Sequence, residues 1–475
     1  MLLWNLESSY LGLPDSLYSF VATDPAPGPS WAAFNTELAR DLGMGSDPER
    51  EDLLILSGSA PPPGGTSYAQ AYAGHQFGYF AMLGDGRAAV LGEAVDPSGA
   101  RRDLQLKGSG PTPYARGGDG KAALGPMLRE HLIGEYLHAL GIPCTRALSV
   151  ALTGESVRRE AAKPGAVLCR VAASHLRVGT FQYAAAFAGP EALKALADYA
   201  AWRHYPSIRE SDAPYVGFLD AVGLSQAKLV VAWMAAGFVH GVMNTDNVSI
   251  AGQAIDFGPC AFLDTFKSGQ VFSSIDREGR YAWGRQPSVA AWNHARLAEA
   301  LLPLLHEDEA TALVLAEASL ARFKKTMEGA LIAAFSRKLG IAKPRVGDRA
   351  LIHELLDWME RVGADFTSTF QAIGRHAAGQ ASSGPLPESA WLGRWSARIG
   401  AEADPLGLMA AANPLVHPRN RPVQAALDAA ESGDLAPFNR LLSALKSPYD
   451  PESTLPELEP SAADAAAAFV TYCGT

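Results

Sequence analysis

The sequence predicts an α+β fold in which a small β-rich region with one key helix precedes a larger α-helical region. Short β-like runs alternate with glycines between residues 72 and 107, residues 147–172 have the pattern of further strands, and helical periodicity dominates from about residue 190 to residue 446. The chain has 475 residues, of which 48% are hydrophobic and 19% charged, so it can bury a large core.

The β-rich region is built from short runs separated by turn residues. Residues 1–60 carry short mixed patterns, and residues 61–65, Pro-Pro-Pro-Gly-Gly, break the chain. Strands are expected at residues 88–91 and 104–107, and two or three more at residues 147–172. The one helix is expected at residues 122–140, where apolar side chains recur every fourth position and Gly-Ile-Pro ends the pattern.

The second half of the chain is mainly helical. Helices are expected at residues 225–239, 288–305, 309–339, 348–360 and 422–446. Residues 447–461 are rich in proline and acid, as in a linker or a tail held against the body. We therefore expect an extension at 1–65, a β-rich N-lobe at 66–180, a helical C-lobe at 181–446 and a tail at 447–475.

Composition indicates a cytoplasmic protein. The net charge is −10 and no basic run appears, which argues against nucleic acid as a partner. The N-terminus lacks a basic segment and carries Glu7, so it does not fit a signal peptide. The longest apolar run, Leu229 to Val239, is about half of a bilayer span, which argues against a membrane. Four cysteines are too few for a disulfide framework in so long a chain.

The most informative segment runs from His240 to Asn247 and is followed by Asp256-Phe-Gly258. Protein kinases carry H-R-D-x-x-x-x-N and then D-F-G, with the first Asp as catalytic base. Here Val242 stands at the base position and cannot accept a proton; the nearby carboxylate is Asp246. The chain is thus either an inactive kinase relative or a nucleotide enzyme with different chemistry, and its two regions match the two-lobed plan of kinases.

Asn247 and Asp256 are candidate ligands for Mg²⁺ or Mn²⁺. Both offer hard oxygen atoms, which suit a metal that bridges phosphates. Asp246 could act as base or support the ligands, although Asp and Asn are also common in turns. We expect His240 to be a packed structural histidine.

Gly84, Gly86 and Arg87 form a candidate phosphate loop, since close glycines expose backbone N–H groups and arginine pairs with phosphate. The alternative is a simple Asp-Gly hairpin turn. Lys107, at the end of a strand, matches the kinase lysine that contacts phosphates and pairs with a helix glutamate, though it could also be a solvated surface lysine. Glu130 is its expected partner because its helix face carries apolar residues; Glu135 competes, on a face that looks more exposed.

Four further residues are candidates for binding the nucleotide. Asp119 and Gly120 form a loop before the helix, either a lid or a helix-start turn. Arg170 on a strand and Arg177 in the following loop could converge on a polyphosphate, because the guanidinium fork binds phosphate bidentately. Ordinary surface arginines are the alternative.

Together these motifs resemble the selenoprotein O family, also called YdiU, over residues 65 to 475. The resemblance is carried by Tyr72-Ala-Gly-His-Gln-Phe-Gly78, Leu83-Gly-Asp-Gly-Arg-Ala88, Gln105-Leu-Lys-Gly-Ser-Gly110, Thr112-Pro-Tyr114, Arg129-Glu130, Leu140-Gly-Ile-Pro143, Gly241-Val-Met-Asn-Thr-Asp-Asn247 and Asp256-Phe-Gly-Pro259. The ending, Tyr472-Cys-Gly-Thr475, is similar to the family's tail, where cysteine or selenocysteine lies near the C-terminus.

The resemblance implies a pseudokinase-like enzyme that transfers AMP from ATP to protein hydroxyls, with ATP reversed relative to kinases. Asp246 would accept the proton of a Ser, Thr or Tyr hydroxyl, and Asn247 and Asp256 would hold Mg²⁺ or Mn²⁺. The residues implied to bind ATP are Gly84, Gly86, Arg87, Lys107, Asp119, Gly120, Glu130, Arg170, Arg177 and Asp256.

Two positions depart from the family pattern. Phe257 stands where the family often has tyrosine, which is a conservative change. Gly125-Pro126 replaces an expected basic or polar pair; proline is tolerated in a first helical turn, but the start of the helix and the aim of Glu130 become less defined.

The family's redox-active tail further implies a hypothesis in which Cys260 and Cys473 form a regulatory disulfide. The alternative is a buried cysteine and a free tail thiol.

Three classes of function stay open: AMP transfer, kinase-like phosphate transfer with Asp246 as base, and a non-catalytic nucleotide-binding scaffold. UMP transfer from UTP is a variant of the first, because no residue visibly selects the base. The sequence leaves the oligomeric state open.

Overall fold

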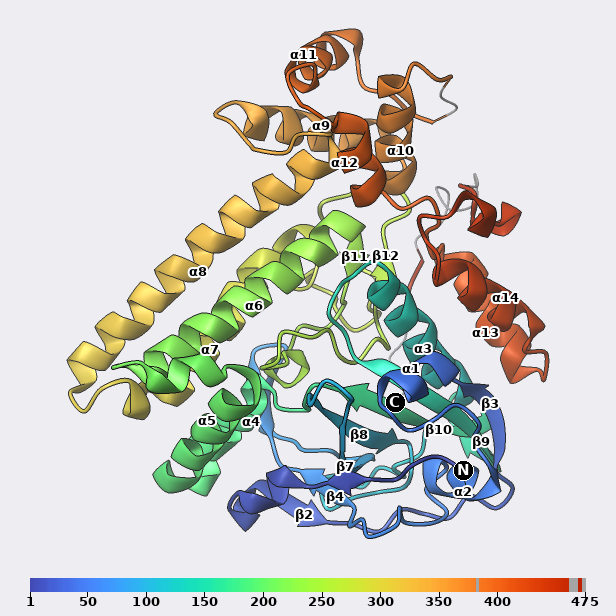
Figure 1. Ribbon diagram of the computed structural model, residues 1–475, viewed down its shortest axis with the longest axis vertical. Coiled ribbons are helices and arrows are strands. Elements are labelled where there is room, and N and C mark those ends of the chain that lie inside the picture. The colour runs from blue at the N-terminus through green and yellow to red at the C-terminus, as the bar shows by residue number, and fades with distance from the viewer. Residues whose placement is uncertain (382–383, 461–468, 472–475) are drawn as a thin grey trace.

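The computed structural model describes residues 1–381, 384–460 and 469–471. It is a mixed α/β molecule with an antiparallel sheet on one side and helices on the other (Figure 1). A long helix, α8 (Glu309–Lys338), crosses the helical part diagonally, and α13 (Asn420–Glu431) and α14 (Ala436–Leu445) lie against α3 (Leu124–Ala139).

The main sheet has the strand order β2-β4-β7-β8-β10-β9-β3, with β1 paired to β7. Its strands pair antiparallel throughout the described residues, and β8 lies between β7 and β10, with Lys107 opposite Ala88 and Leu168. The strands are β1 (Leu6–Glu7), β2 (Tyr18–Phe20), β3 (Ser30–Phe34), β4 (Tyr68–Gln70), β5 (Ala73–Gln76), β6 (Tyr79–Met82), β7 (Ala88–Val95), β8 (Arg101–Lys107), β9 (Arg146–Arg158), β10 (Ala162–Ala172), β11 (Phe238–Val239) and β12 (Ala261–Phe262).

The first 65 residues, expected as an extension, contribute strands to this same sheet. β1 pairs with β7, β2 with β4 and β3 with β9. These strands are 2, 3 and 5 residues long, too short to give a clear alternating pattern in the sequence. Strand pairing therefore joins residues 1–65 to the β-rich region, and the proposed boundaries of the regions stay predictions.

The predicted key helix is α3, which packs against β9 and β10. Pro126 occupies its first turn, where a missing N–H costs no hydrogen bond. A Cβ on Gly134 would lie 2.8 Å from the carbonyl oxygen of Thr145, so glycine allows α3 to approach the chain that enters β9.

The helical region differs from expectation mainly in how it is divided. The helix expected at 225–239 begins earlier, at Pro214, and ends at Ala236, because Gly237 takes a left-handed conformation. The stretch expected as one helix at 422–446 is two, α13 and α14, interrupted at residues 432–435. The remaining helices are α1 (Thr36–Asp41), α2 (Arg50–Leu56), α4 (Val178–Tyr183), α5 (Pro190–His204), α6 (Pro214–Ala236), α7 (Gln286–Leu305), α9 (Asp348–Val362), α10 (Phe366–Ala377), α11 (Ser389–Ile399) and α12 (Pro405–Ala412).

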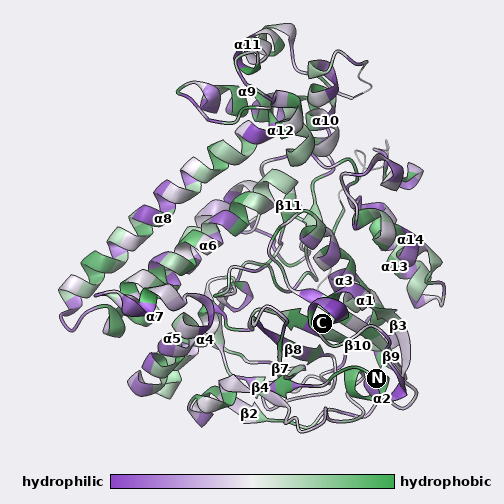
Figure 2. Ribbon diagram, in the orientation of Figure 1, coloured by the Kyte–Doolittle hydropathy of each residue, from purple (hydrophilic) through white to green (hydrophobic). Residues whose placement is uncertain are grey.

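Among the described residues, the helix α6 is long and apolar enough, by length and composition alone, to cross a membrane. More than half of its most apolar stretch, 56%, is buried inside the protein, as in a core helix. It packs against α7 and α8. In Figure 2, by contrast, hydrophobic and hydrophilic residues alternate along α8, much of which faces outward.

The described part of the tail is tied to the body at Thr471. Its hydroxyl donates to the carbonyl of Pro259 at 2.7 Å, and its N–H donates to the carbonyl of Phe272 at 2.8 Å. Cys260 is fully buried. Cys473, its proposed disulfide partner, lies outside the described residues.

Candidate active site

The segment from His240 to Asp256 is held by a small two-stranded ladder. β11 pairs with β12, so the chain leaves and returns at the same place. His240 is fully buried and its Nε2 contacts the carbonyl oxygen of Ile255 at 2.8 Å, the structural role expected of it. The loop includes η5 (Thr245–Asn247), a single 3₁₀ turn that carries Asp246 and Asn247 side by side.

Asp256 is surrounded by three cations from three different elements. Its Oδ1 accepts hydrogen bonds from Lys107 Nζ and Arg170 Nη1, both at 2.6 Å, and its Oδ2 lies 3.5 Å from Arg177 Nη1. Burial disfavours its charge, but these cations outweigh burial and hold the pKa of Asp256 well below its usual value. Asp256 also has a φ of 65°, a strained conformation for a residue with a side chain.

Lys107 and Glu130 form the expected pair across the space between β8 and α3. Both are buried, and Lys107 Nζ donates to Glu130 Oε1 as well as to Asp256. The competing residue, Glu135, was expected on an exposed face, and that expectation is wrong. Glu135 is only 1% exposed and pairs with Arg146 at 2.8 Å, away from Lys107, because α3 is buried on several sides.

Arg170 and Arg177 both approach the Asp256 carboxylate. Further contacts with neighbouring groups hold each guanidinium in place. Arg170 Nη2 donates to Gln105 Oε1 at 2.6 Å. Arg177 Nη1 donates to the carbonyl of Asp246 at 2.8 Å, and its guanidinium lies over the Tyr72 ring, 4.5 Å from the centroid. Both arginines are at most 3% exposed, so neither is the ordinary surface residue that the sequence left as the alternative.

Asp246 carries a buried carboxylate oxygen without a hydrogen-bond partner, as Glu130 does at its Oε2. Its Oδ2 accepts a hydrogen bond from Gln76 Nε2 at 3.0 Å, while Oδ1 is buried without a hydrogen-bond partner. Burial is the main cause that raises the pKa of Asp246 to about 6, and Arg177 opposes the shift. A carboxylate so placed can accept a proton near neutral pH.

The residues around η5 fit a divalent cation only with help from other ligands. Asn247 Nδ2 donates to the carbonyl of Val242 at 3.1 Å, and its Oδ1 accepts no hydrogen bond from the part of the chain that the structure describes. Among the described residues no three His, Cys, Asp or Glu side chains gather closely enough to hold a metal by themselves. Mg²⁺ commonly takes one or two protein ligands and completes its shell with phosphate oxygens and water, so the donor set fits that kind of site.

The two glycines of the loop Gly84-Asp-Gly86 leave room for the neighbouring Tyr114. A Cβ on Gly84 would come within 2.3 Å of the Tyr114 ring, and one on Gly86 within 2.9 Å of the Tyr114 carbonyl. The glycines therefore let the backbone pass under Tyr114. Asp85 between them is buried and lies 3.6 Å from Arg177.

Asp119 pairs with Arg159, and both residues line the cavity of the site. Its Oδ2 accepts from Arg159 Nη1 at 2.8 Å, and its side chain is about half exposed. Gly120, at φ 67°, is packed against the backbone of Gly110, which fixes the end of this loop.

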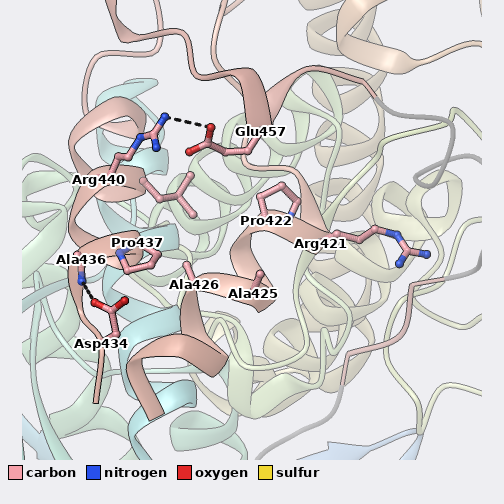
Figure 3. Close-up of a pocket in the computed structure, with 10 residues that line it drawn as sticks. Arg421, Pro422, Ala425, Ala426, Asp434, Ala436, Pro437, Arg440 and Glu457 are labelled. Carbon is pink, nitrogen blue, oxygen red and sulfur yellow. Dashed lines mark hydrogen bonds and ion pairs between the residues drawn. The ribbon is translucent and has the colours of Figure 1, made fainter. Parts of the chain in front are cut away.

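A central cavity of about 370 Å³ brings all these residues together. Its lining includes every residue predicted for the site: Gly84, Gly86, Arg87, Lys107, Asp119, Gly120, Glu130, Arg170, Arg177, Asp246, Asn247 and Asp256. A wider cavity of about 720 Å³ lies elsewhere, between α13 and α14, and is shown in Figure 3. Its walls combine alanine, proline and leucine with Arg421, Asp434, Arg440 and Glu457, and they contain none of the residues predicted for the site.

Comparison with known proteins agrees with this constellation. The family model described as protein adenylyltransferase SelO matches residues 1–446. The chain belongs to the SelO family. It is 47% identical to a protein nucleotidyltransferase YdiU of Bacillus mycoides, with 99% of this chain and 98% of the relative covered. Relatives with the same name are 48% identical in Geobacillus kaustophilus and in Methylorubrum populi, with 99% and 100% of this chain and 99% of each relative covered.

The family and the enzyme class expected from the motifs, a nucleotidyltransferase, are thereby confirmed. The SelO match also begins at residue 1, whereas the motifs had placed the resemblance from about residue 65. This agrees with the pairing of β1, β2 and β3 into the main sheet.

The sequence did not reveal the residues that hold Arg170, Arg177 and Asp246 in place. Tyr72, Gln76 and Asp85 were seen only as letters of motifs, yet each contacts Arg177 or Asp246. Gln105 fixes Arg170. Their signal was their presence inside the short motifs that carry the family resemblance, but nothing local indicated which distant side chain each would contact.

Proposed function

We propose that this chain transfers AMP from ATP to Ser, Thr or Tyr hydroxyls of protein substrates and releases pyrophosphate. The observation that carries the proposal is the difference between Asp256 and Asp246 in the central cavity. Three cations gather around Asp256, while Asp246 keeps a buried, unpaired oxygen next to them. A kinase-like base at position 242 is missing, since Val242 stands there.

The cations supply a binding site for the triphosphate. In the structure Lys107 and Arg170 use Asp256 as their counter-ion. Phosphate oxygens would share or replace these contacts, which charge-assisted hydrogen bonds favour. Arg177 and Arg170 come from α4's N-cap and β10, beyond the glycine loop. Their position supports a nucleotide whose α-phosphate lies near Asp246.

Asn247 and Asp256 would hold Mg²⁺ or Mn²⁺ together with phosphate oxygens. When bound, such an ion neutralises charge that builds up on the phosphates.

Asp246 would take the proton of the acceptor hydroxyl. The hydroxyl oxygen forms a bond to the α-phosphorus, the bond from that phosphorus to the α,β-bridging oxygen breaks, and pyrophosphate leaves with its electron pair. Lys107, Arg170 and Arg177 would stabilise the charge on the leaving group. The raised pKa of Asp246, about 6, favours this role, because a base closer to neutral takes a proton more readily.

We further propose that the molecule has the two-lobed plan of protein kinases. The main sheet with α3 would form the smaller lobe, residues 66–180 with the strands of 1–65, and the helical part to residue 446 the larger one. The Lys107–Glu130 pair between β8 and α3 supports this correspondence. A cytoplasmic location, with no membrane or nucleic-acid partner, stays a prediction.

The test uses ATP labelled at either the α- or the γ-phosphate, incubated with the full chain, a protein mixture and Mg²⁺ or Mn²⁺. We expect protein to acquire label from the α-phosphate only, and Asp256→Ala to lose at least about 10²-fold in rate. Asp357→Ala, which removes an exposed carboxylate on α9, is the matched control and should keep full rate.

Label from the γ-phosphate alone would make the chain a kinase and overturn the proposal. Labelling from α-labelled UTP in preference to ATP would change the transferred group to UMP. Bound nucleotide without transfer from either label would favour the scaffold function.

A further inference from the structure

The hairpin of β5 and β6 lies directly against the candidate base. Three consecutive positions of the hairpin bond to three consecutive residues of the loop. The N–H of His75 donates to Thr245 Oγ1 at 2.8 Å, Gln76 Nε2 donates to Asp246, and the N–H of Phe77 donates to the side-chain oxygen of Asn244 at 3.0 Å. A Cβ on Gly74 would come within 2.8 Å of Asp246 Oδ1.

The outer part of this hairpin is apolar and exposed. Tyr79 is 82%, Phe80 45% and Met82 53% exposed. Phe187, which is 49% exposed and comes from η3 (Ala184–Ala188), stacks on Phe80 with ring centroids 6.2 Å apart. We call these four residues the hairpin patch. Large exposed aromatic side chains gathered from two elements are typical of a contact surface.

A basic edge continues the patch on the other side of His75. The His75 ring contacts Trp292 edge-on at 5.2 Å, and the Arg280 guanidinium lies 4.7 Å from the centre of that indole ring. In the described part of the chain Arg280 has no carboxylate within ion-pair distance, whereas Arg296 on the same ring pairs with Glu299. The edge therefore offers one uncompensated cation in a protein whose net charge is −10.

The closeness of the hairpin patch to Asp246 indicates which partner covers it. Gly74 and Gln76 of the hairpin lie next to the Asp246 carboxylate. A protein whose hydroxyl reaches Asp246 therefore comes close to the hairpin, and the exposed side chains of the patch lie only a few positions further along the same two strands.

Resting on the proposed function, we infer that the hairpin patch docks the protein substrate. The substrate segment presents a large apolar side chain to Phe80 and Phe187 and a carboxylate toward Arg280, with the modified hydroxyl close to both in sequence. The patch thus selects the sequence around the acceptor, whereas the central cavity binds the nucleotide.

The test uses short synthetic peptides with a central Ser, Thr or Tyr in a neutral background. One series carries Leu or Phe at each flanking position in turn, a second adds Glu at each position, and a third carries neither. Transfer from α-labelled ATP is measured with the full chain. Binding of fluorescent versions is measured separately by anisotropy, without nucleotide.

We expect the Leu- or Phe-bearing peptides to be preferred at one or two positions, and Glu to add to the preference at another. Phe80→Ser and Phe187→Ser, which come from different elements, should each raise the KM for those peptides by about tenfold. They should leave the KM for ATP and the rate with the peptide that lacks an apolar residue unchanged. Arg280→Gln should remove only the preference for Glu. Val362→Ser, a similarly exposed apolar residue at the end of α9, is the control.

Equal use of all peptides, or variants that keep the wild-type preference, would overturn the docking inference while AMP transfer stands. Preferential binding of apolar peptides that depends on Phe80, without any α-label transfer, would retain the docking surface and refute the proposed reaction. If no peptide binds or reacts, although folded proteins acquire label, a short apolar segment is not what the patch recognises and the inference fails.

Discussion

Asp256 shows how one residue holds the site together before a nucleotide arrives. Three cations would repel one another if they were left alone in a buried space, and its carboxylate is the charge that they share. The left-handed backbone at Asp256 aims the side chain at them. Strain of this kind persists only where the surroundings fix it, as these contacts do.

Asp246 is best tested by a change that keeps its shape. Asp246→Asn removes the ability to accept a proton but can keep an oxygen toward Gln76. We expect transfer from α-labelled ATP to fall by about 10²–10⁴-fold. Nucleotide binding, followed by a fluorescent ATP analogue, should persist, because Lys107, Arg170 and Arg177 are untouched. A variant that retains more than a tenth of the wild-type rate would exclude Asp246 as the base.

Glu130 and Glu135 are both buried on α3, so the same substitution at each position compares a residue that lines the central cavity with one that lies away from it. Glu130→Gln weakens the partner of Lys107, and we expect kcat/KM for ATP to fall by about 10²-fold as the lysine moves. Glu135→Gln weakens the pair with Arg146 instead, away from the cavity. It should lower the free energy of unfolding by about 1–3 kcal/mol and leave kcat/KM unchanged. Urea unfolding and steady-state kinetics on both variants decide the point; equal losses of activity would contradict it.

At the scale of elements, the loop of residues 116–121 shows why a glycine can be needed for space and not only for conformation. Gly117 and Gly120 both have positive φ, of 82° and 67°. A Cβ on Gly117 meets nothing within 4 Å, whereas one on Gly120 would lie 2.0 Å from the backbone of Gly110. Only Gly120 therefore closes the loop onto the segment that follows Lys107.

Replacing each of these two glycines with alanine distinguishes the cost of backbone strain from the cost of a steric collision. Gly117→Ala should lower the free energy of unfolding by about 1–2 kcal/mol through its left-handed backbone. Gly120→Ala should cost about 1–3 kcal/mol more, because the chain at Gly110 must move. We expect the KM for ATP to rise for Gly120→Ala alone, since that loop lines the central cavity. Thermal unfolding and ATP kinetics measure both; identical behaviour would mean that the contact with Gly110 is unimportant.

At the scale of the whole molecule, buried histidines make the fold sensitive to acid. Burial lowers the pKa of His131, His175 and His294 to about 4, and that of His204 to about 3, from 6.5. The unfolded chain binds protons at these sites below pH 6.5, whereas the folded chain does not until about pH 4. The stability that these neutral histidines contribute is fully present above pH 6.5 and is lost as the pH falls through that window.

We expect the free energy of unfolding to fall between pH 6 and pH 4.5 with a slope of about 1.4 kcal/mol per pH unit for each such histidine. His131 packs on Phe438, and His131→Leu should reduce the slope by one histidine's share. His353→Gln, on the exposed side of α9, should leave it unchanged. Urea unfolding at several pH values measures the slopes, and a wild-type curve that is flat over this range would refute the prediction.

The sequence by itself determined the family, the enzyme class and much of the local structure. The spacing from His240 to Asn247, the Asp256-Phe-Gly258 triplet and the strand that ends at Lys107 identified the lining of the central cavity. The periodicity of residues 122–140 identified α3. These features are local, because covalent spacing and the side-chain period of a helix or strand are written within a few turns of the chain.

Only the tertiary structure decided which of these residues meet. Lys107 and Asp256 are 149 positions apart, and Gln76 and Asp246 are 170 apart. The same kind of distant pairing fixes the place of β1, β2 and β3 in the sheet, the burial of Glu135 and the contact of the hairpin with the loop of residues 244–246. Their physical reason is burial: a charge or amide removed from water must find a partner, and that partner is chosen by packing of the whole chain and not by its neighbours in sequence.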